Sequence, residues 1–301
     1  MGIYKPKVTV VGSANIDLVT KTNRVPLLGE TILGESFQQF PGGKGANQAV
    51  AAARLGADVS FIGCVGNDPF GHDLKRLLAK EQIDITGIDT NFEVSTGVAQ
   101  ITLSNQDNSI IVVPGANHML SAEWIEKNKP LIVNADIVLL QLEIPLEIVA
   151  MVVTIAHESN IPVILNPAPA QKLSADLLSK ITYLTPNGSE IELLSPNSED
   201  IISKTLYLQK LGVKNMIVTR GAEGVVYKSE DNPTTSKDSI KVEVVDSTGA
   251  GDSFNGALAV AIGAGKSIDE AIDFSIKVAA VSVTKLGAQS GMPYLKELIE
   301  Y

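Results

Sequence analysis

Short apolar runs alternate along most of the chain with longer stretches of small or amphipathic residues. Continuous apolar runs of this length predict buried strands, and the stretches between them have the composition of helices. The predicted strands cover residues 7–11, 59–65, 137–141, 162–166, 182–185 and 215–219. The predicted helices cover residues 45–55, 70–82, 146–159, 174–180, 189–194, 199–211 and 256–262. This order predicts an α/β fold with a predominantly parallel sheet and helices on both faces.

Two segments break this alternation. One contains two β-rich runs separated by the polar turn 104–109, a pattern typical of a hairpin. The other, 17–40, is non-helical and interrupted by proline and glycine. We expect both segments to form a small β-sheet lid. The lid would comprise residues 17–40 and 97–114, and the main domain residues 1–16, 41–96 and 115–301.

The composition limits the classes of partner. The chain has 301 residues and a net charge of −10, which argues against nucleic acid because nucleic-acid binding needs a basic face. Its apolar runs are shorter than the ~20 residues that cross a membrane, and its start lacks the apolar core of a signal peptide. The single cysteine, Cys64, excludes a disulfide within the chain. We therefore expect a cytoplasmic protein without a membrane or nucleic-acid partner.

A glycine-rich turn that contains Gly249, Ala250, Gly251 and Asp252 precedes the predicted helix 256–262. A turn without large side chains at a helix start exposes backbone N–H groups, which form an anion site together with the helix dipole. A carboxylate beside that site costs electrostatic energy. Its natural role is to take a proton from a hydroxyl group that attacks a phosphate. Taken alone, the motif also fits a plain tight turn with Asp252 near an N-cap.

A second glycine-rich turn, 41–48, leads into the predicted helix 45–55. Its glycines let the backbone approach a polar ligand, toward which Lys44 and Asn47 would point. The spacing is neither that of a Walker A loop nor that of the Gly-x-Gly-x-x-Gly dinucleotide loop. The absence of the latter after the first strand argues against an oxidoreductase of the Rossmann type.

Polar residues follow several predicted strands. Because the carboxyl ends of parallel strands meet at one edge of a sheet, we expect these residues to gather there. Asn15 and Asp17 have the size and polarity to hold adjacent sugar hydroxyls, and Glu143 needs a polar partner after its apolar strand. Asn187 and Glu190 also fit a helix cap. The set at this edge is Asn15, Asp17, Glu143, Asn166, Asn187 and Thr219.

The glycine turns and the Asn-x-x-Glu element together resemble the ribokinase (PfkB) family of carbohydrate kinases. The resemblance covers essentially the whole chain, with its motifs in the family's order. They lie at residues 42–47, 166–170, 187–190, 246–252 and 287–289. The resemblance implies ATP-dependent phosphorylation of D-ribose at O5, with Mg²⁺ accompanying the ATP.

The family's roles carry over where residues match. Asp252 would be the base, kept ionised by the helix N-terminus with its pKa little raised. The amides of Gly249, Ala250, Gly251 and Asp252 would form the anion hole. The sugar would be held by Asn15, Asp17, Gly43, Lys44, Asn47, Glu143 and Asp252. The nucleotide would be held by Asn187, Thr219, Gly221, Gly224, Gly251 and Lys277, with Glu190 serving Mg²⁺ through water.

The resemblance also implies K⁺ as a monovalent activator. Its ligands would be Asp246, Thr248, Ser282, Lys285, Gly287 and Gly291, several of them through backbone carbonyls. The chain departs from the family at Gly291, where the family often has serine. One side-chain ligand would then be missing, with water or Ser290 in its place.

Two alternatives remain open from the sequence. One is the same chemistry on 2-deoxyribose, adenosine or a ketohexose; Asn15 favours a sugar with a 2-hydroxyl because an unpartnered buried amide is penalised. The other is a non-catalytic sugar or nucleotide sensor, against which the base and the anion-hole glycines argue. The edge strands of a lid hairpin need cover, so we also expect a homodimer through the lid strands.

Overall fold

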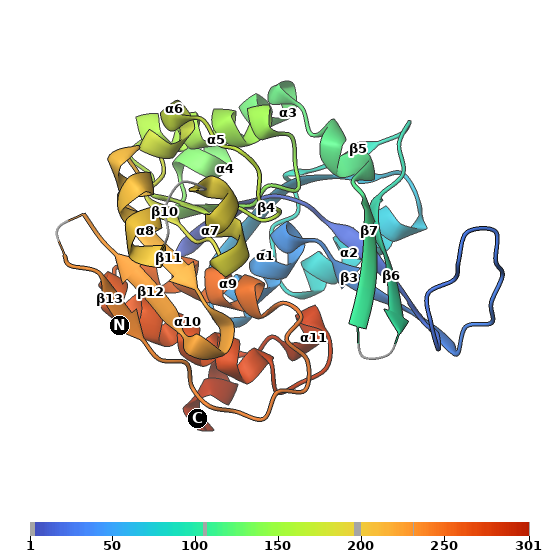
Figure 1. Ribbon diagram of the computed structural model, residues 1–301. Coiled ribbons are helices and arrows are strands. Elements are labelled where there is room, and N and C mark those ends of the chain that lie inside the picture. The colour runs from blue at the N-terminus through green and yellow to red at the C-terminus, as the bar shows by residue number, and fades with distance from the viewer. Residues whose placement is uncertain (1–3, 105–106, 196–199, 231, 301) are drawn as a thin grey trace.

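Two β-sheets organise the fold (Figure 1), which is described here from a computed structural model for residues 4–104, 107–195, 200–230 and 232–300. Within these residues nine strands form a large sheet in the order β13-β12-β11-β10-β9-β8-β1-β4-β5. They are β1 (Lys7–Val11), β4 (Asp58–Gly66), β5 (Ile88–Asn91), β8 (Ile137–Leu140), β9 (Val163–Leu165), β10 (Tyr183–Leu184), β11 (Asn215–Thr219), β12 (Val225–Lys228) and β13 (Thr235–Lys237). All neighbouring strands pair in parallel except β12, which is antiparallel to β11 and β13.

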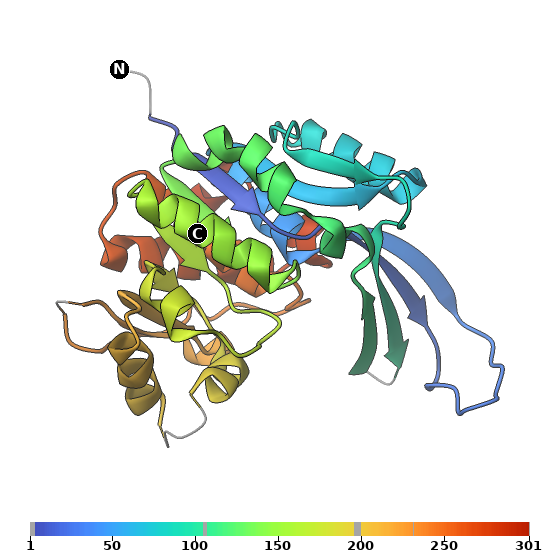
Figure 2. The same cartoon turned by 90° about the horizontal axis from the view of Figure 1, so that it is seen from above.

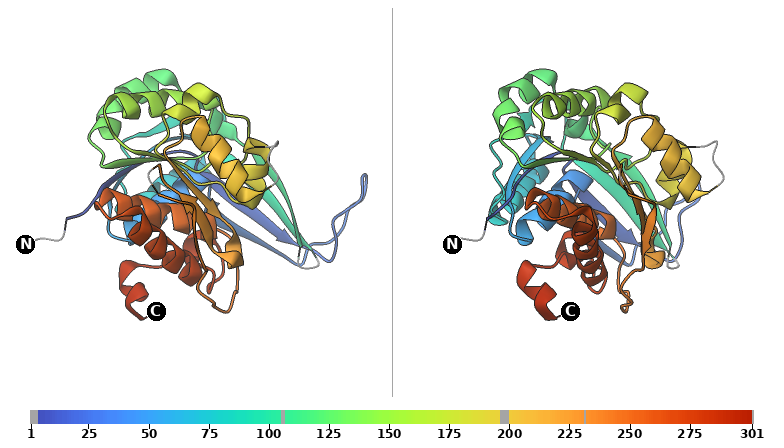
Figure 3. Two further views of the ribbon diagram at one scale, coloured as in Figure 1. Left: turned by 60° about the vertical axis from the view of Figure 1, so that its left-hand side comes forward. Right: turned by 90° about the vertical axis from the view of Figure 1, so that its left-hand side faces the viewer.

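Helices cover both faces of the large sheet (Figure 3). The helices are α1 (Lys44–Arg54), α2 (Pro69–Lys80), α3 (Ala122–Lys127), α4 (Lys129–Val133), α5 (Leu146–Glu158), α6 (Ala175–Ser179), α7 (Gly188–Leu194), α8 (Ile201–Lys210), α9 (Ala250–Gly263), α10 (Ile268–Ser282) and α11 (Ala288–Gly291). Short 3₁₀ segments lie at Gly115–Met119, Gly221–Glu223 and Leu295–Glu300. The predicted class, a mostly parallel sheet between helical layers with a small second sheet, is confirmed.

The strand β8 shows why its sequence is apolar throughout. Its four residues are all buried and point alternately to the two faces of the sheet. Ile137 and Leu139 pack in the core shared with α1, α9 and α10, whereas Val138 and Leu140 pack in the core shared with α5. A strand covered on both faces has no position for a solvated side chain, so it forms a continuous apolar run.

A small sheet extends to one side of the large sheet (Figure 2). Among the described residues it has the order β3-β2-β6-β7, with β2 and β6 parallel and the other pairs antiparallel. Its strands are β2 (Asn15–Lys21), β3 (Ser36–Gly42), β6 (Gly97–Ser104) and β7 (Asp107–Val113). The hairpin expected on each side of the turn 104–109 is therefore present as β6 and β7. The first strand of the small sheet begins at Asn15 rather than at residue 17. The division into two domains at the expected boundaries stays a prediction.

Candidate active site

The helices α1 and α9 pack closely enough for their backbones to touch. Gly256 of α9 lies against α1, where a Cβ atom would come within 2.6 Å of Cβ of Ala51 and 2.9 Å of the carbonyl oxygen of Gln48. Small residues on both helices therefore permit this close approach. The packing brings the polar pair Asn47 and Gln48 of α1 beside Asp252, in the first turn of α9.

The carboxylate of Asp252 is buried, with 8% of its surface exposed. Its two oxygens accept hydrogen bonds from Nδ2 of Asn47 and Nε2 of Gln48, each at 2.9 Å. Burial raises the pKa of Asp252 above its usual value, although Lys44, Gln48 and Asn47 act in the opposite direction. Burial therefore outweighs the groups that favour the ionised form, and the expectation that this pKa is raised only a little stays a prediction.

A polar cavity of about 200 Å³ opens at the N-terminus of α9, beside Asp252. Gly249, in the left-handed conformation at φ +77°, makes the turn that begins the helix. The first helical hydrogen bond is donated by Ser253 to the carbonyl of Gly249, so the N–H groups of Gly251 and Asp252 precede the helical pattern. Ala250 differs, because its N–H already donates to the carbonyl of Ser247 at 3.2 Å. The Ala250 amide is therefore already engaged, and an anion hole formed by its neighbours stays a prediction.

Lys44 is the cation at the centre of the candidate site, and it lines the polar cavity with Asp252. Burial lowers the pKa of its ammonium group. Four surrounding carboxylates outweigh this effect and hold the pKa above its ordinary value. They are Asp252, Glu143, Glu190 and Asp17. Lys44 therefore stays protonated and offsets the mutual repulsion of the carboxylates.

Asn15 and Asp17 both lie on β2, where the small sheet meets the large one. Asn15 is buried, and its Oδ1 accepts a hydrogen bond of 2.6 Å from Nδ2 of Asn117. Burial raises the pKa of Asp17 to about 6, assisted by repulsion from Glu143 and Asp252. Glu143 accepts hydrogen bonds from the hydroxyl of Ser13 and from the N–H of Lys44. Four of the residues expected to hold a sugar therefore interact with Asp252, namely Asp17, Lys44, Asn47 and Glu143. Of the whole expected set, only Lys44 and Asp252 belong to the described lining of the polar cavity.

Asn187 and Glu190 form a capping box at the start of α7. Oδ1 of Asn187 accepts from the N–H of Glu190 at 2.8 Å, and the Glu190 carboxylate accepts from the N–H of Asn187 at 2.8 Å. Both residues also line the polar cavity, opposite the N-terminus of α9. Burial raises the pKa of Glu190, while the hydrogen bond from Asn187 and the charge of Lys44 act against it. The pair is therefore a helix cap whose polar atoms also face a cavity.

A second, larger cavity of about 710 Å³ adjoins the first, and the two share Thr219, Ser247, Ala250 and Gly251. Apolar residues dominate its walls, and a polar entrance next to an apolar chamber suits a phosphate chain attached to a flat ring. The expected residues Thr219, Gly221 and Gly224 line it. Lys277 does not. It lies on α10 beside Ile276, which belongs to the described lining.

The residues assigned to K⁺ come together in one loop region. The carboxylate of Asp246 accepts hydrogen bonds from the N–H groups of Thr248 at 2.9 Å and Gly287 at 2.8 Å. Burial raises its pKa, but these hydrogen bonds outweigh burial and lower the pKa overall. A Cβ atom on Gly291 would fall 2.6 Å from the carbonyl oxygen of Ser282 and 3.6 Å from that of Lys285. Oxygen donors of this kind fit a hard cation.

Ser290 was expected to offer a substitute for the side chain that Gly291 lacks. Its hydroxyl donates instead to the carbonyl oxygen of Leu286 at 2.6 Å. The serine thus already has a partner within its own turn. Within the described ranges, no group of three or more His, Cys, Asp or Glu side chains is arranged to hold a metal ion.

Several residues around Asp252 were not assigned from the sequence. Gln48 is fully buried between Asp252, Asn166 and Gln141, and Oε1 of Gln141 has no hydrogen-bond partner among the described residues. The signal was present in α1, where two adjacent amides interrupt a run of small apolar residues. No local pattern pointed to the segment 239–244, which lines the larger cavity without regular secondary structure.

This combination of fold and site defines an enzyme of small-molecule phosphoryl transfer, and the chain belongs to the pfkB family of carbohydrate kinases, whose model matches residues 5–295. It is 43% identical to the ribokinase of Lactococcus lactis, over 97% of this chain and 95% of that protein. The structure of Arabidopsis thaliana ribokinase complexed with ribose and ATP matches with a TM-score of 0.92 and 33% identity, over 99% and 98% of the two chains. The deoxyribokinase of Salmonella typhi is 35% identical, over 98% of each chain. In the part of the chain that the structure describes, no helix has the length and apolar character needed to cross a bilayer.

Proposed function

We propose that this chain is an ATP-dependent ribokinase, which transfers the terminal phosphoryl group of ATP to O5 of D-ribose. The observation that carries the proposal is the position of the Asp252 carboxylate. It lies at the N-terminus of α9, between the polar cavity and the residues assigned to the sugar. A carboxylate there has a proton to accept only when a hydroxyl group reaches it from the sugar side.

In this proposal Asp252 takes the proton of the sugar hydroxyl while that oxygen bonds to the terminal phosphorus of ATP and the bond from this phosphorus to the bridging oxygen breaks, which releases ADP. Its raised pKa brings it nearer to the working pH, where a general base is most effective. The N–H groups of Gly249, Gly251 and Asp252 would stabilise the charge that develops on the transferred group. The protein otherwise contributes position and charge, since phosphoryl transfer has a loose transition state.

Mg²⁺ would enter with ATP and neutralise phosphate charge. The chain offers it the carboxylate of Glu190 and the amide of Asn187, both in the lining of the polar cavity. One carboxylate and few other donors fit Mg²⁺, which usually keeps several waters and binds substrate phosphates. We assign the larger cavity to the nucleoside, next to Thr219, Gly221 and Gly224, and keep Lys277 as a residue at its margin.

K⁺ would be held by the carboxylate of Asp246 and the carbonyl oxygens of Ser282 and Lys285, with Thr248, Gly287 and Gly291 completing the loop. The arrangement of oxygen atoms around Gly291 supports this assignment. A bound cation there would make the loop that begins α9 more rigid and so stabilise the position of the anion hole.

Replacing K⁺ by tetramethylammonium in the coupled assay described below is expected to lower kcat. An unchanged kcat would count against the proposed K⁺ site.

The acceptor is tested with a coupled assay that follows ADP release on D-ribose, 2-deoxyribose, adenosine and D-fructose. We expect D-ribose to give the highest kcat/KM, because the buried amide of Asn15 would lose a partner when the 2-hydroxyl is absent. A higher kcat/KM on 2-deoxyribose would favour the deoxyribokinase alternative, which the Salmonella relative supports. No turnover on any of the sugars would favour a non-catalytic sensor.

A second copy of the chain is proposed to cover the small sheet. The strand register aligns Val19, Ile101 and Ile110 in one row, on the face that also carries Asp17. Ile110 is 52% exposed. An apolar row on an open sheet favours association, and a homodimer would bury it.

The buried free thiol of Cys64 supports a reducing, cytoplasmic setting.

Replacing Ile110 with glutamate is expected to convert the dimer into a monomer, because a charge would be buried without a partner. Sedimentation velocity at micromolar concentration measures the change. The matched control is Ser109→Glu, which places the same charge on the opposite face of β7. A wild-type protein that sediments as a monomer would contradict the proposal.

A further inference from the structure

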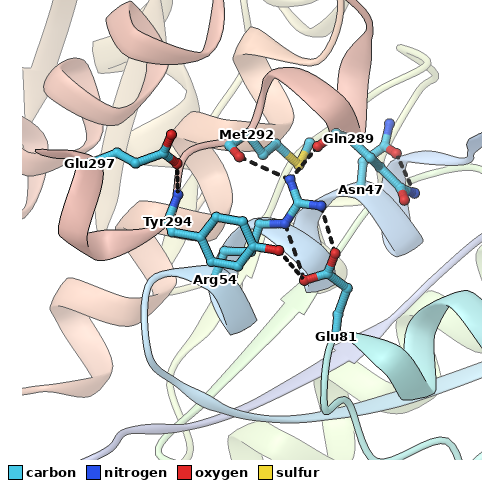
Figure 4. Close-up of polar contacts among 7 residues, drawn as sticks. All are labelled: Asn47, Arg54, Glu81, Gln289, Met292, Tyr294 and Glu297. Carbon is cyan, nitrogen blue, oxygen red and sulfur yellow. Dashed lines mark hydrogen bonds and ion pairs between the residues drawn. The ribbon is translucent and has the colours of Figure 1, made fainter.

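A chain of hydrogen bonds connects Gln289 with the carboxylate of Asp252. Gln289 lies on α11, and its Nε2 donates to Oδ1 of Asn47 at 3.0 Å. Nδ2 of Asn47 in turn donates to Oδ2 of Asp252 at 2.9 Å. Figure 4 shows the amides of Gln289 and Asn47 facing each other across the gap between α11 and α1. Gln289 thus acts on Asp252 through one intermediate side chain.

The contact with Gln289 selects the orientation of the Asn47 amide. A primary amide presents an acceptor at one end and donors at the other. The donor from Gln289 occupies the Asn47 oxygen, so the nitrogen of the same amide is left to face Asp252. If the donor were lost, the amide could rotate and place its oxygen against the carboxylate. That orientation repels the ionised form of Asp252 and tolerates only the protonated form.

Arg54 holds the segment that carries Gln289 (Figure 4). Its Nη1 donates to the carbonyl oxygens of Gln289 and Met292, the latter at 2.9 Å. Its guanidinium forms a paired contact with Glu81, with Nη2 at 2.6 Å and Nε at 3.2 Å, and lies 4.8 Å from the ring centroid of Tyr294. Only 12% of the Arg54 side chain is exposed. A guanidinium fixed on several sides cannot be replaced by lysine without losing contacts.

The helix α1 therefore contributes twice to this arrangement. Near its start it presents Asn47 to Asp252, and at its last residue it anchors α11 through Arg54. Both contacts depend on one rigid element, so the distance from Gln289 to Asn47 is set by the geometry of a single helix.

We propose that Gln289 is a positioning residue for Asp252, acting through the orientation of the Asn47 amide, and that Arg54 keeps Gln289 in reach of it. The inference rests on the proposed role of Asp252 as the base. Among the described residues, Gln289 is not part of the lining of the polar cavity, and its side chain donates its hydrogen bond to Asn47.

The titratable groups that face Asp252 come from other elements. They are Lys44 of α1, Glu143 after β8, Glu190 of α7 and Asp17 of β2. A substitution at Gln289 leaves all four in place. A change in the pH dependence of such a variant would therefore report the amide of Asn47 rather than a lost charge.

The test compares Gln289→Met, which keeps the length of the side chain and removes the donor, with wild-type enzyme. We expect kcat to fall about 10- to 100-fold while the KM values for D-ribose and ATP change less than about threefold. The acid limb of the kcat–pH profile is expected to move to higher pH, because the ionised base has lost its oriented donor. Gln289→Glu presents an acceptor to Asn47 and should lower kcat further. Gln209→Met, on α8, is the matched control.

Two outcomes for Gln289→Met would overturn the proposal. The first is a kcat and a pH profile close to those of the wild type. The second is a lower kcat with an unmoved acid limb, since a merely structural role would produce it. Asp252→Asn measured in parallel distinguishes failure of the base role of Asp252 from failure of the positioning role of Gln289. Activity in Asp252→Asn rejects the base itself, whereas an inactive Asp252→Asn with a normal Gln289→Met rejects only the positioning role.

A double-mutant cycle tests the part played by Arg54. If Arg54 acts through Gln289, Arg54→Lys should lower kcat in the wild type and have little further effect in the Gln289→Met background. Additive losses in the two backgrounds would show that Arg54 acts by another route and would overturn that part of the proposal. Thermal unfolding of each variant, measured alongside, verifies that the compared proteins are folded.

Discussion

Replacing Asp252 with asparagine is expected to lower kcat by a factor of about 10² to 10⁴, the usual contribution of a positioned general base. The asparagine has nearly the same shape and can still accept one hydrogen bond, but it cannot take a proton from the sugar hydroxyl. The nucleotide would bind as before, because the larger cavity does not include this side chain in its described lining. The measurement is kcat in the coupled assay together with ADP affinity by calorimetry.

The same substitution is expected to leave the protein folded. Burial raises the pKa of Asp252, which means that the ionised side chain disfavours the native state when the pH exceeds the folded pKa, and asparagine removes that penalty. In exchange, its amide nitrogen faces one of the two donors, Nδ2 of Asn47 or Nε2 of Gln48, so the two effects on stability oppose each other. Asp176→Asn, at the exposed start of α6, is the control for loss of a carboxylate elsewhere. A kcat within threefold of the wild type would remove Asp252 from the base role.

Replacing Asp17 with asparagine is expected to raise the KM for the sugar about 100-fold, since a hydrogen bond to a charged group contributes about 1.5–3 kcal/mol. In the wild type the KM for the sugar is expected to depend on pH, because the pKa of Asp17 is about 6. The KM for the sugar should fall as the pH rises from 5 to 7 and the carboxylate becomes ionised, whereas in Asp17→Asn it should stay constant. Steady-state kinetics over that range measures both.

The raised pKa of Asp17 also predicts how the unfolding free energy depends on pH. Its pKa rises from 3.8 to about 6 on folding, so between these values the native state binds more protons than the unfolded chain. The stability contributed by this group is therefore present at low pH and is lost as the pH rises through about 6. The difference corresponds to at most about 3 kcal/mol. The unfolding free energy of Asp17→Asn should equal that of the wild type near pH 4 and exceed it near pH 7.

The matched control is Asp58→Asn, an exposed carboxylate at the start of β4. Its denaturation curves should follow those of the wild type across the range. Parallel unfolding free energies for Asp17→Asn and wild type between pH 4 and 7 would contradict the raised pKa. An unchanged KM for the sugar would contradict the binding role separately.

Elements with strong local signals were predicted from the sequence almost residue by residue. The strand β1 covers the predicted residues 7–11, and α1 begins at Lys44, directly after the glycine turn. The helix α10 was missed, although Ser267 and Glu270 form a capping box before an apolar stretch. That signal was available in the sequence. The strands β12 and β13, at one end of the large sheet, were missed because short strands without a turn motif resemble loops.

The residues of the candidate site also divide into those with a local sequence motif and those without one. Asp252, Lys44 and the glycine turns stood out because each carries a distinctive local motif. Gln48 did not, and Gln289 stood out only as the last residue of the motif 287–289, without a role, since each glutamine acts here through partners far away in the chain. The donor from Gln48 crosses 204 positions to Asp252, and that from Gln289 crosses 242 positions to Asn47.

The sequence by itself determined the α/β class, the small second sheet and the position of a carboxylate at a helix start, because these follow from periodicity and turn chemistry over a few residues. Only the tertiary structure decided the direction of the pKa shift and the orientation of that carboxylate. The pKa of Asp252 depends on how deeply α9 is buried against α1. Its hydrogen bonds depend on which amides that packing brings within 3 Å, and no local pattern contains this information.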